Sequence, residues 1–194
     1  MTREFVYFSA SASTSGKALS GDLMKAGRID IAIHSIIQGL FLSHDYRKDA
    51  KMHLVFYGMP DPPKHIEIQV TPELEINKKD VGRIIQKLLY KYKPGEKKEV
   101  LPGCFVEKKS FLNVIDELHN QGKEIFILDK RGKDIRQVEI KDNPVFIVGD
   151  HEGLPKKELR RLKEIATSVS IGQRIYFASQ TVAVVNNELD YRNI

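Results

Sequence analysis

The sequence predicts an α/β protein with a largely parallel sheet flanked by helices. Short apolar runs typical of buried strands alternate along the chain with amphipathic segments typical of helices, which is the order expected for this class. Two of the predicted strands, 145–149 and 167–171, lead into Gly149 and Gly172. Because the carboxyl ends of parallel strands share one edge of a sheet, these glycine turns indicate a small-molecule pocket there.

Length and composition favour one globular domain over residues 1–194. The chain is 41% hydrophobic and 29% charged, which is typical of a folded protein with one sizeable core. No apolar run approaches the roughly 18 residues of a membrane span, and the first residues lack an apolar signal core. The only cysteine, Cys104, excludes an internal disulfide framework. We therefore expect a cytoplasmic protein without a membrane partner.

The formal net charge is +5. A basic balance favours polyanionic partners such as nucleic acids. Many soluble proteins are mildly basic as well, so charge alone leaves both interpretations open.

The first predicted elements are a strand at 5–9, a polar loop at 10–15 and a helix at 29–41. The loop hydroxyls suit either a phosphate site or a plain connection. Arg28 and Asp30 lie at the entrance of the helix, where an acidic residue serves either ordinary helix capping or a functional site.

A second strand is predicted at 52–58 and ends in a stiff loop containing Pro60, Pro62 and Pro63. This loop holds Asp61 on a rigid backbone at a strand end, where ligands often dock in α/β sheets; a plain turn aspartate is the alternative. Residues 65–70 alternate like a half-exposed strand. Residues 77–80 resemble a capping box that opens a helix with an apolar face from Val81 to Leu89.

Basic residues with interleaved tyrosines follow this helix, before a break at residues 94–95. They suit either contacts to a nucleic-acid backbone or the dipole at a helix C-terminus. A second basic segment, 130–133, is predicted as a turn after the strand 124–129. The candidate phosphate contacts in the two segments are Lys91, Lys93, Lys97, Lys98, Arg131 and Lys133.

The rest of the chain continues the alternation. We expect a strand at 104–107, a helix at 110–121 that ends at Gly122, a helix at 155–164 and a last helix at 179–190.

Several common motifs are missing from the sequence. It has no dinucleotide-binding Gly-x-Gly-x-x-Gly after the first strand, no phosphate-binding loop and no Gly-x-Ser-x-Gly elbow. No cysteine or histidine pair has the local spacing of a zinc motif, so we expect no metal. Motifs alone stop at a small-molecule-binding α/β protein.

Several blocks in a fixed order go further. Residues 148–154, 170–172, 178–181 and 186–190 resemble the SPOUT class of RNA methyltransferases. Residues 27–30 and 42–49 narrow this likeness to the archaeal-type tRNA pseudouridine-N1-methyltransferases, over essentially the whole chain.

The resemblance implies a deep trefoil knot at about 124–194, S-adenosylmethionine as methyl donor, tRNA as substrate and a homodimer with the pocket beside the dimer contact. By position, the residues that would bind the donor are Leu128, Gly149, Gly153, Ile171, Gly172, Gln173, Arg174, Ile175, Tyr176 and Thr181. Relatives often have a cysteine where this chain has Thr181, which leaves any role for a thiol in doubt here.

The resemblance further implies methyl transfer to N1 of pseudouridine at position 54 in the T-loop of tRNA. Arg28 would position the base, and Asp30 and Asp61 are the candidates to accept the N1 proton. A ribosomal pseudouridine substrate and a non-catalytic RNA-binding protein with the same fold are the alternatives.

Overall fold

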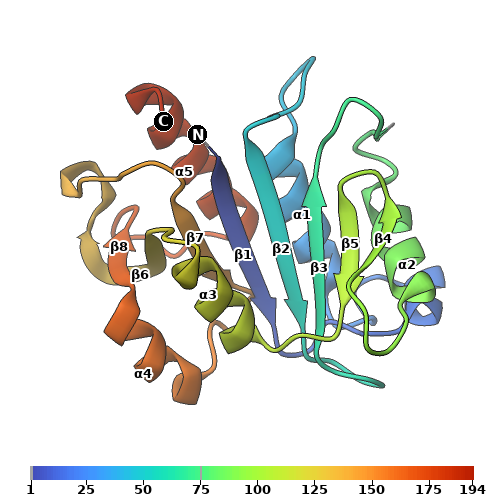
Figure 1. Ribbon diagram of the computed structural model, residues 1–194. Coiled ribbons are helices and arrows are strands. Elements are labelled where there is room, and N and C mark those ends of the chain that lie inside the picture. Colours follow the sequence, from blue (N-terminus) through green and yellow to red (C-terminus); the bar gives the residue numbers. More distant parts are fainter. Residues whose placement is uncertain (1, 75) are drawn as a thin grey trace.

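An eight-stranded sheet with the order β4-β5-β3-β2-β1-β7-β6-β8 forms the centre of the computed structural model (Figure 1), which describes residues 2–74 and 76–194. The parallel strands are β2, β1, β7, β6 and β8, while β3, β5 and β4 extend the sheet through antiparallel pairs. The predicted α/β class is confirmed. Its parallel part contains the candidate site.

The strands are β1 Arg3–Ser9, β2 Ala50–Phe56, β3 Lys64–Gln69, β4 Lys98–Leu101, β5 Cys104–Glu107, β6 Ile125–Asp134, β7 Val145–Gly149 and β8 Thr167–Ser170. The α-helices are α1 Ile29–Leu40, α2 Val81–Lys91, α3 Phe111–Asn120, α4 Lys156–Ile165 and α5 Ala178–Arg192, with short 3-10 helices at Gly16–Ser20 and Ile135–Gln137. Within the described residues, no helix is both long and apolar enough to cross a membrane.

Helices cover both faces of the sheet because side chains alternate along its strands (Figure 1). In β1, Phe5 and Tyr7 point into a core that also contains side chains of α1, α2 and α5. Val6 and Phe8 point the other way, into a second core with α3 and α4. Burial on both faces explains why β1 is buried along its whole length.

Strand β3 differs from the half-exposed strand that we expected. Its first five residues are buried, because β3 lies inside the sheet between β2 and β5 and both of its faces are covered. The polar residues His65 and Glu67 are 3% and 8% exposed. The alternation of polar and apolar residues therefore does not mark solvent exposure here, and that prediction was wrong.

The predicted capping box at residues 77–80 is also wrong. Helix α2 begins at Val81, and the Asp80 side chain makes no capping hydrogen bond. Instead, the Lys79 N–H donates to Asn77 Oδ1 at 2.9 Å, which forms a local turn before the helix.

Strand β6 continues through residues 130–133, which we expected to form a turn. Val169 of β8 pairs with both Leu128 and Lys133, so the parallel register of β6 against β8 shifts between these two residues. A Cβ atom at Gly132 would lie 2.5 Å from the Val169 nitrogen. Only glycine allows this approach without a shift of one strand.

Candidate active site

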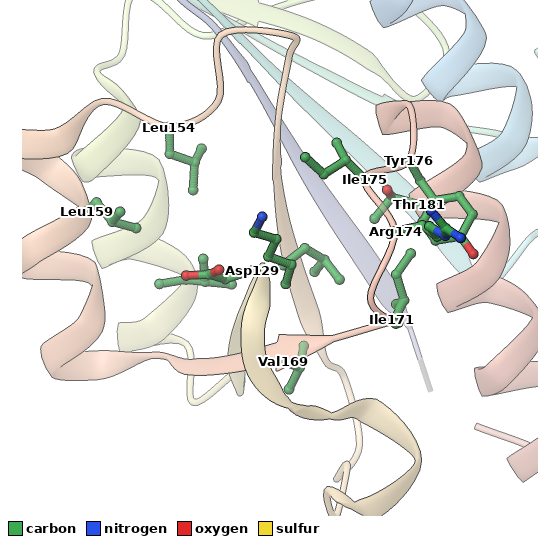
Figure 2. Close-up of a pocket in the computed structure, with 13 residues that line it drawn as sticks. Asp129, Leu154, Leu159, Val169, Ile171, Arg174, Ile175, Tyr176 and Thr181 are labelled. Atoms are coloured by element: carbon green, nitrogen blue, oxygen red, sulfur yellow. The ribbon is translucent and has the colours of Figure 1, made fainter.

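Two adjoining cavities lie where residues 127–130 of β6 and the turns after β7 and β8 meet the first turn of α5, and Figure 2 shows the first of them. The first cavity has a volume of about 300 Å³, and the second has a volume of about 410 Å³. Both are lined by Leu128, Leu154, Ile175, Tyr176 and Thr181. The two strand-end turns that the sequence pattern indicated, after β7 and β8, therefore share one hollow region with the middle of β6.

Glycines shape two of these turns. A Cβ atom at Gly149 would lie 2.6 Å from the Gly153 carbonyl carbon, and Gly153 has a φ of +78°. The loop folds back on itself there, with the Gly153 N–H donating to the Asp150 carbonyl at 3.1 Å. After β8, Gly172 has a φ of +139°, and its N–H donates to Ser170 Oγ at 3.1 Å.

The first cavity suits a nucleoside with an apolar contact surface. Ile127, Val169 and Ile171 form aliphatic walls that suit a purine ring, and its volume lies at the low end of the range for small-molecule sites. Asp129 at the end of the wall offers carboxylate oxygens for sugar hydroxyls. These lining residues thus fit the adenosine portion of S-adenosylmethionine.

Nine of the ten residues expected to bind the donor line these cavities. Those around the first cavity are Leu128, Ile171, Gly172, Arg174, Ile175, Tyr176 and Thr181, and those around the second include Gly149 and Gly153. Among the described residues, Gln173 is absent from both linings. The Thr181 hydroxyl donates to the Phe177 carbonyl at 3.1 Å, so its proton is already engaged within the helix.

Arg28 and Asp30 form a two-point ion pair at the start of α1. Arg28 Nε donates to Asp30 Oδ1 and Arg28 Nη2 donates to Asp30 Oδ2, each at 3.0 Å. The hydrogen bond from Arg28 lowers the pKa of the Asp30 carboxyl. Asp30 lies inside the first turn rather than at the cap, and the next residue, Ile31, lines the second cavity. A carboxylate with a lowered pKa is a good hydrogen-bond acceptor and a weak base.

Asp61 lies elsewhere. Its carboxylate accepts hydrogen bonds from Lys108 and, at 2.6 Å, from Lys64, and these bonds lower its pKa. Its N–H donates to Thr14 Oγ1, which holds the loop against the first strand-end turn. Asp61 is not among the described residues that line the two cavities.

Two polar residues at the site were not among the sequence-based candidates. Asp150 is 9% exposed and lines the second cavity. Its Oδ1 accepts the Glu152 N–H at 2.8 Å, whereas its Oδ2 is buried without a partner in the described part of the chain. Tyr7 has a buried hydroxyl in the same condition, and burial together with the Asp150 and Asp30 carboxylates raises its pKa. Asp150 lies in the segment 148–154 on which the family resemblance rests, so the sequence did mark its neighbourhood. Only its burial in the structure distinguishes it from the other polar residues of that segment.

The six candidate phosphate contacts fall into two separate groups. Lys91, Lys93, Lys97 and Lys98 lie on or near α2 and β4, at one edge of the sheet, while Arg131 and Lys133 lie on β6 beside the other edge (Figure 1). Lys97 Nζ donates to Glu67 Oε2 at 2.7 Å, so its charge is already paired.

A parallel sheet whose strand-end turns enclose an apolar cavity of nucleoside size defines an α/β protein that binds a nucleotide-like cofactor. The fold is that of Archaeoglobus fulgidus Nep1 bound to S-adenosylhomocysteine, with a TM-score of 0.65 over 100% of both chains at 15% identity. The chain belongs to the family described as "Putative SAM-dependent RNA methyltransferase", which matches residues 2–194. The SPOUT resemblance and the expected donor, S-adenosylmethionine, are confirmed.

Curated relatives carry more specific names. The chain is 34% identical over 197 residues to the tRNA (pseudouridine(54)-N(1))-methyltransferase of Methanococcoides burtonii, covering 99% of this chain and 97% of that protein. It is 36% identical over 172 residues to the enzyme of the same name from Thermococcus kodakarensis, covering 84% and 86%.

Proposed function

We propose that this protein transfers a methyl group from S-adenosylmethionine to N1 of pseudouridine at position 54 in the T-loop of tRNA. The observation that carries the proposal is the shared wall of the two cavities. It sets an apolar space of nucleoside size beside a cavity lined by Asp150, whose buried Oδ2 has no partner among the described residues. The similarity to relatives named for this reaction supports the choice of substrate.

When bound, the donor supplies an activated methyl group and departs as a neutral thioether. The residues of this chain have two tasks, alignment and proton removal. The aliphatic walls and Asp129 hold the adenosine portion in the first cavity. The target base leaves its stack to enter the second cavity.

Asp150 is the proton acceptor in this scheme. Asp150 lines the second cavity, and its buried Oδ2 has no partner among the described residues. By contrast, both Asp30 oxygens bond to Arg28 and both Asp61 oxygens bond to lysines. As N1 forms its bond to the methyl carbon, its proton passes to Asp150 Oδ2. The Arg28–Asp30 pair, next to Ile31 of the cavity lining, is placed to hydrogen-bond the imide edge of the base.

We also propose that the protein acts as a homodimer, as the family resemblance implies, and that it does so in the cytoplasm. Ile175 and Phe177 are 84% and 74% exposed at the mouth of the cavities, where a second copy would cover them. Analytical ultracentrifugation should show a dimer that dissociates in Phe177→Ser. The control variant Tyr90→Ser, exposed on α2 at the other edge of the sheet, should remain dimeric.

We also propose the trefoil knot that the resemblance implies at about residues 124–194. This region contains the shifted parallel pairing of β6 with β8, in which Val169 pairs with both Leu128 and Lys133.

The decisive experiment uses labelled donor with tRNA transcripts that contain either uridine or pseudouridine at position 54. Label on the pseudouridine transcript alone is the expected result. Label on ribosomal RNA fragments instead would favour the ribosomal alternative. RNA binding without donor binding, measured by calorimetry, would favour the non-catalytic alternative.

The basic groups are tested by the salt dependence of tRNA binding. Replacing a residue that truly binds a phosphate should reduce the slope by about one. We expect Arg131→Gln with Lys133→Gln to reduce it, because these residues lie on the strand that lines the cavities. The pair Lys91→Gln and Lys93→Gln tests the distant group.

A further inference from the structure

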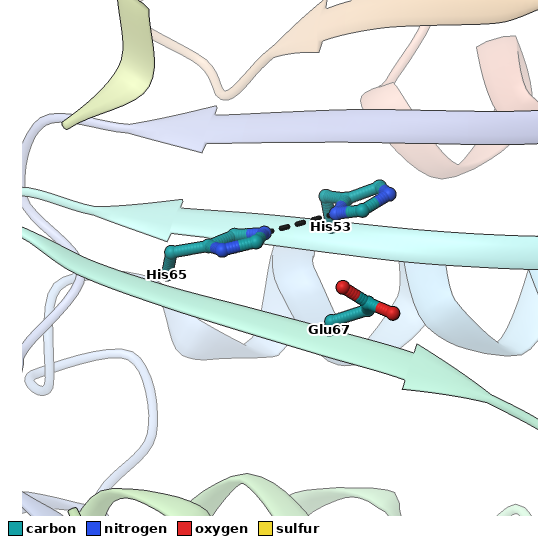
Figure 3. Close-up of side chains that lie close together, drawn as sticks. All are labelled: His53, His65 and Glu67. Atoms are coloured by element: carbon teal, nitrogen blue, oxygen red, sulfur yellow. Dashed lines mark hydrogen bonds between the residues drawn. The ribbon is translucent and has the colours of Figure 1, made fainter. Parts of the chain in front are cut away.

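A row of buried polar side chains crosses the sheet beneath α3, on the face opposite α1 and α5. Glu4 on β1, His53 on β2, His65 on β3 and Glu107 on β5 form this polar row, which we name here. The two imidazole rings are stacked, with an interplanar angle of 10° (Figure 3). Glu67 lies beside them, opposite His53 in the β2–β3 register.

The outer members of the row determine which ring nitrogens carry protons. His53 Nε2 lies 2.9 Å from Glu4 Oε2, and His65 Nδ1 lies 2.9 Å from Glu107 Oε1. Each of these carboxylates is also paired with a lysine, Glu4 with Lys123 and Glu107 with Lys109, which favours the ionised form. Ionised carboxylates only accept hydrogen bonds, so both of these ring nitrogens must be N–H donors.

The other two ring nitrogens, which face each other, then both act as hydrogen-bond acceptors, and neither has an N–H group to donate. His53 Nδ1 and His65 Nε2 face each other at 2.9 Å. If both rings were neutral, two lone pairs would point at each other across this gap. A cation is therefore needed between them, and either a proton or a metal ion supplies it.

We propose that His53, His65 and Glu67 bind one divalent transition-metal ion of the Zn²⁺ class. The three ligand atoms lie within 4.8 Å of one another, and all three residues are buried. Tetrahedral zinc with Zn–N bonds of about 2.0–2.1 Å holds two nitrogens about 3.4 Å apart. The rings therefore need to separate by about 0.5 Å and to turn so that both lone pairs point at the ion.

The groups behind the ligands match those of known zinc sites. Metal-bound histidines commonly donate their second N–H to a carboxylate, which fixes the ring and increases its basicity. Glu4 has this relation to His53, and Glu107 has it to His65. Lys123 and Lys109 in turn bond to these two carboxylates at 2.6 and 2.8 Å.

Glu67 keeps capacity for a metal despite its lysine partners. Its oxygens bond to Lys51 at 3.0 Å and Lys97 at 2.7 Å, but an ionised carboxylate offers about four lone-pair sites. A cavity of about 110 Å³ lies against both histidines and Glu67 and is bordered by Gln121 and Lys123. It provides an entry path and room for a water molecule as fourth ligand.

We expected no metal from the sequence because its histidines and its cysteine lack close spacing within one segment. Here the register of two antiparallel strands brings the ligands together instead. The site shares none of its residues with the linings of the first and second cavities. Its effect is to hold β1, β2, β3 and β5 together, so the inference does not depend on the methyl-transfer proposal.

The test titrates Zn²⁺ into chelator-treated full-length protein in competition with a chromophoric chelator. We expect one zinc per chain and a higher Tm with zinc. Co²⁺ should give the visible absorption of a tetrahedral site. His53→Gln should abolish this binding, and Glu67→Gln should weaken it at least about tenfold. The control His44→Gln, on an exposed loop, should bind like the unchanged chain.

Equal zinc binding by the unchanged chain and His53→Gln would overturn the proposal and leave a shared proton between the rings. If His53→Gln does not fold, the unchanged chain and Glu67→Gln decide the question. Absence of the tetrahedral cobalt spectrum in the former, or equal zinc affinity in both, would reject the site.

Discussion

The polar row and the second cavity differ in whether their buried polar groups already have partners. In the polar row, every imidazole nitrogen of His53 and His65 lies 2.9 Å from another polar atom of the row, and one cation between the two nitrogens that face each other satisfies all of them. Asp150, which lines the second cavity, has an Oδ2 without a partner in the described chain, and the hydroxyl of Tyr7 in β1 also has none there. An unsatisfied buried polar atom costs about 1–3 kcal/mol, which is tolerated where a ligand completes it. The contrast predicts that changes in the row affect stability and changes at the cavity affect turnover.

The largest expected effect concerns Glu4. Its pKa falls from 4.5 to about 2 on folding, so between these pH values the unfolded chain binds a proton that the folded chain does not. Stability from this group is therefore fully present above about pH 4.5 and is lost as the pH falls toward 2. Glu4→Gln should lower the free energy of unfolding at pH 7 by about 3 kcal/mol. Urea unfolding across pH measures both effects.

In Glu4→Gln the pH dependence below 4.5 should also become flatter. Exposed Glu164→Gln provides the matched control and should change neither quantity. If Glu4→Gln unfolded like the unchanged chain, the polar row would not stabilise the sheet.

Asp150→Asn tests the other side of the comparison. The amide keeps the oxygen that accepts the Glu152 N–H, so the loop should persist, but it cannot accept the N1 proton. We expect kcat to fall about 100-fold, about 2.7 kcal/mol in activation free energy. Single-turnover kinetics with saturating donor should show this decrease, and the free energy of unfolding should change by less than about 1 kcal/mol. A decrease of twofold or less would exclude Asp150 as the proton acceptor.

Gly132→Ala should affect both properties, because Gly132 of β6 lies against Val169 of β8, which lines the first cavity. The added Cβ would lie 2.5 Å from the Val169 nitrogen, and such overpacking should lower the free energy of unfolding by about 2 kcal/mol. Donor affinity, measured by calorimetry, should fall as well. Gly21→Ala has open space around the new methyl group and should leave both unchanged.

Asp30→Asn should act on substrate binding more than on chemistry. It weakens the two-point pair with Arg28 that we place against the base. We expect KM for tRNA to rise about tenfold, about 1.4 kcal/mol, with a smaller change in kcat. A fall in kcat with constant KM would instead indicate proton transfer to Asp30.

Asp61→Asn should have the smallest effect. Its carboxylate is 49% exposed and paired with lysines, and exposed pairs contribute about 0–1 kcal/mol. We expect kcat and KM within about twofold of the unchanged protein. A large decrease in turnover would restore Asp61 to the reaction scheme.

The sequence was informative where local patterns decide the structure. Alternation of apolar runs and amphipathic segments predicted the α/β class, and glycines after strands indicated the turns that enclose the cavities. It failed where distant strands decide. The four-residue strand β4 was missed. Residues 130–133 were wrongly predicted as a turn, because they form part of a strand only through their pairing with β8.

The candidate site divides in the same way. Glycine positions reflect backbone demands that are local and therefore visible in sequence. The state of Asp150 is not local, since only the fold shows that one carboxylate oxygen is buried without a partner among the described residues. Asp61 is the opposite case, a carboxylate whose oxygens are already paired. Its partners Lys64 and Lys108 come from β3 and from the segment after β5, so the sequence around Asp61 does not reveal the pairing.

The shifted pairing of β6 with β8 also bears on synthesis of the chain. The walls of both cavities end with Thr181 in α5, and Val169 must already lie against Leu128 and Lys133 for those walls to meet. A nascent polypeptide that has left the ribosome only as far as β7 thus lacks the residues of β8 and α5 that would bind the methyl donor. Cofactor retention would mark ribosomal products that have completed their last helix.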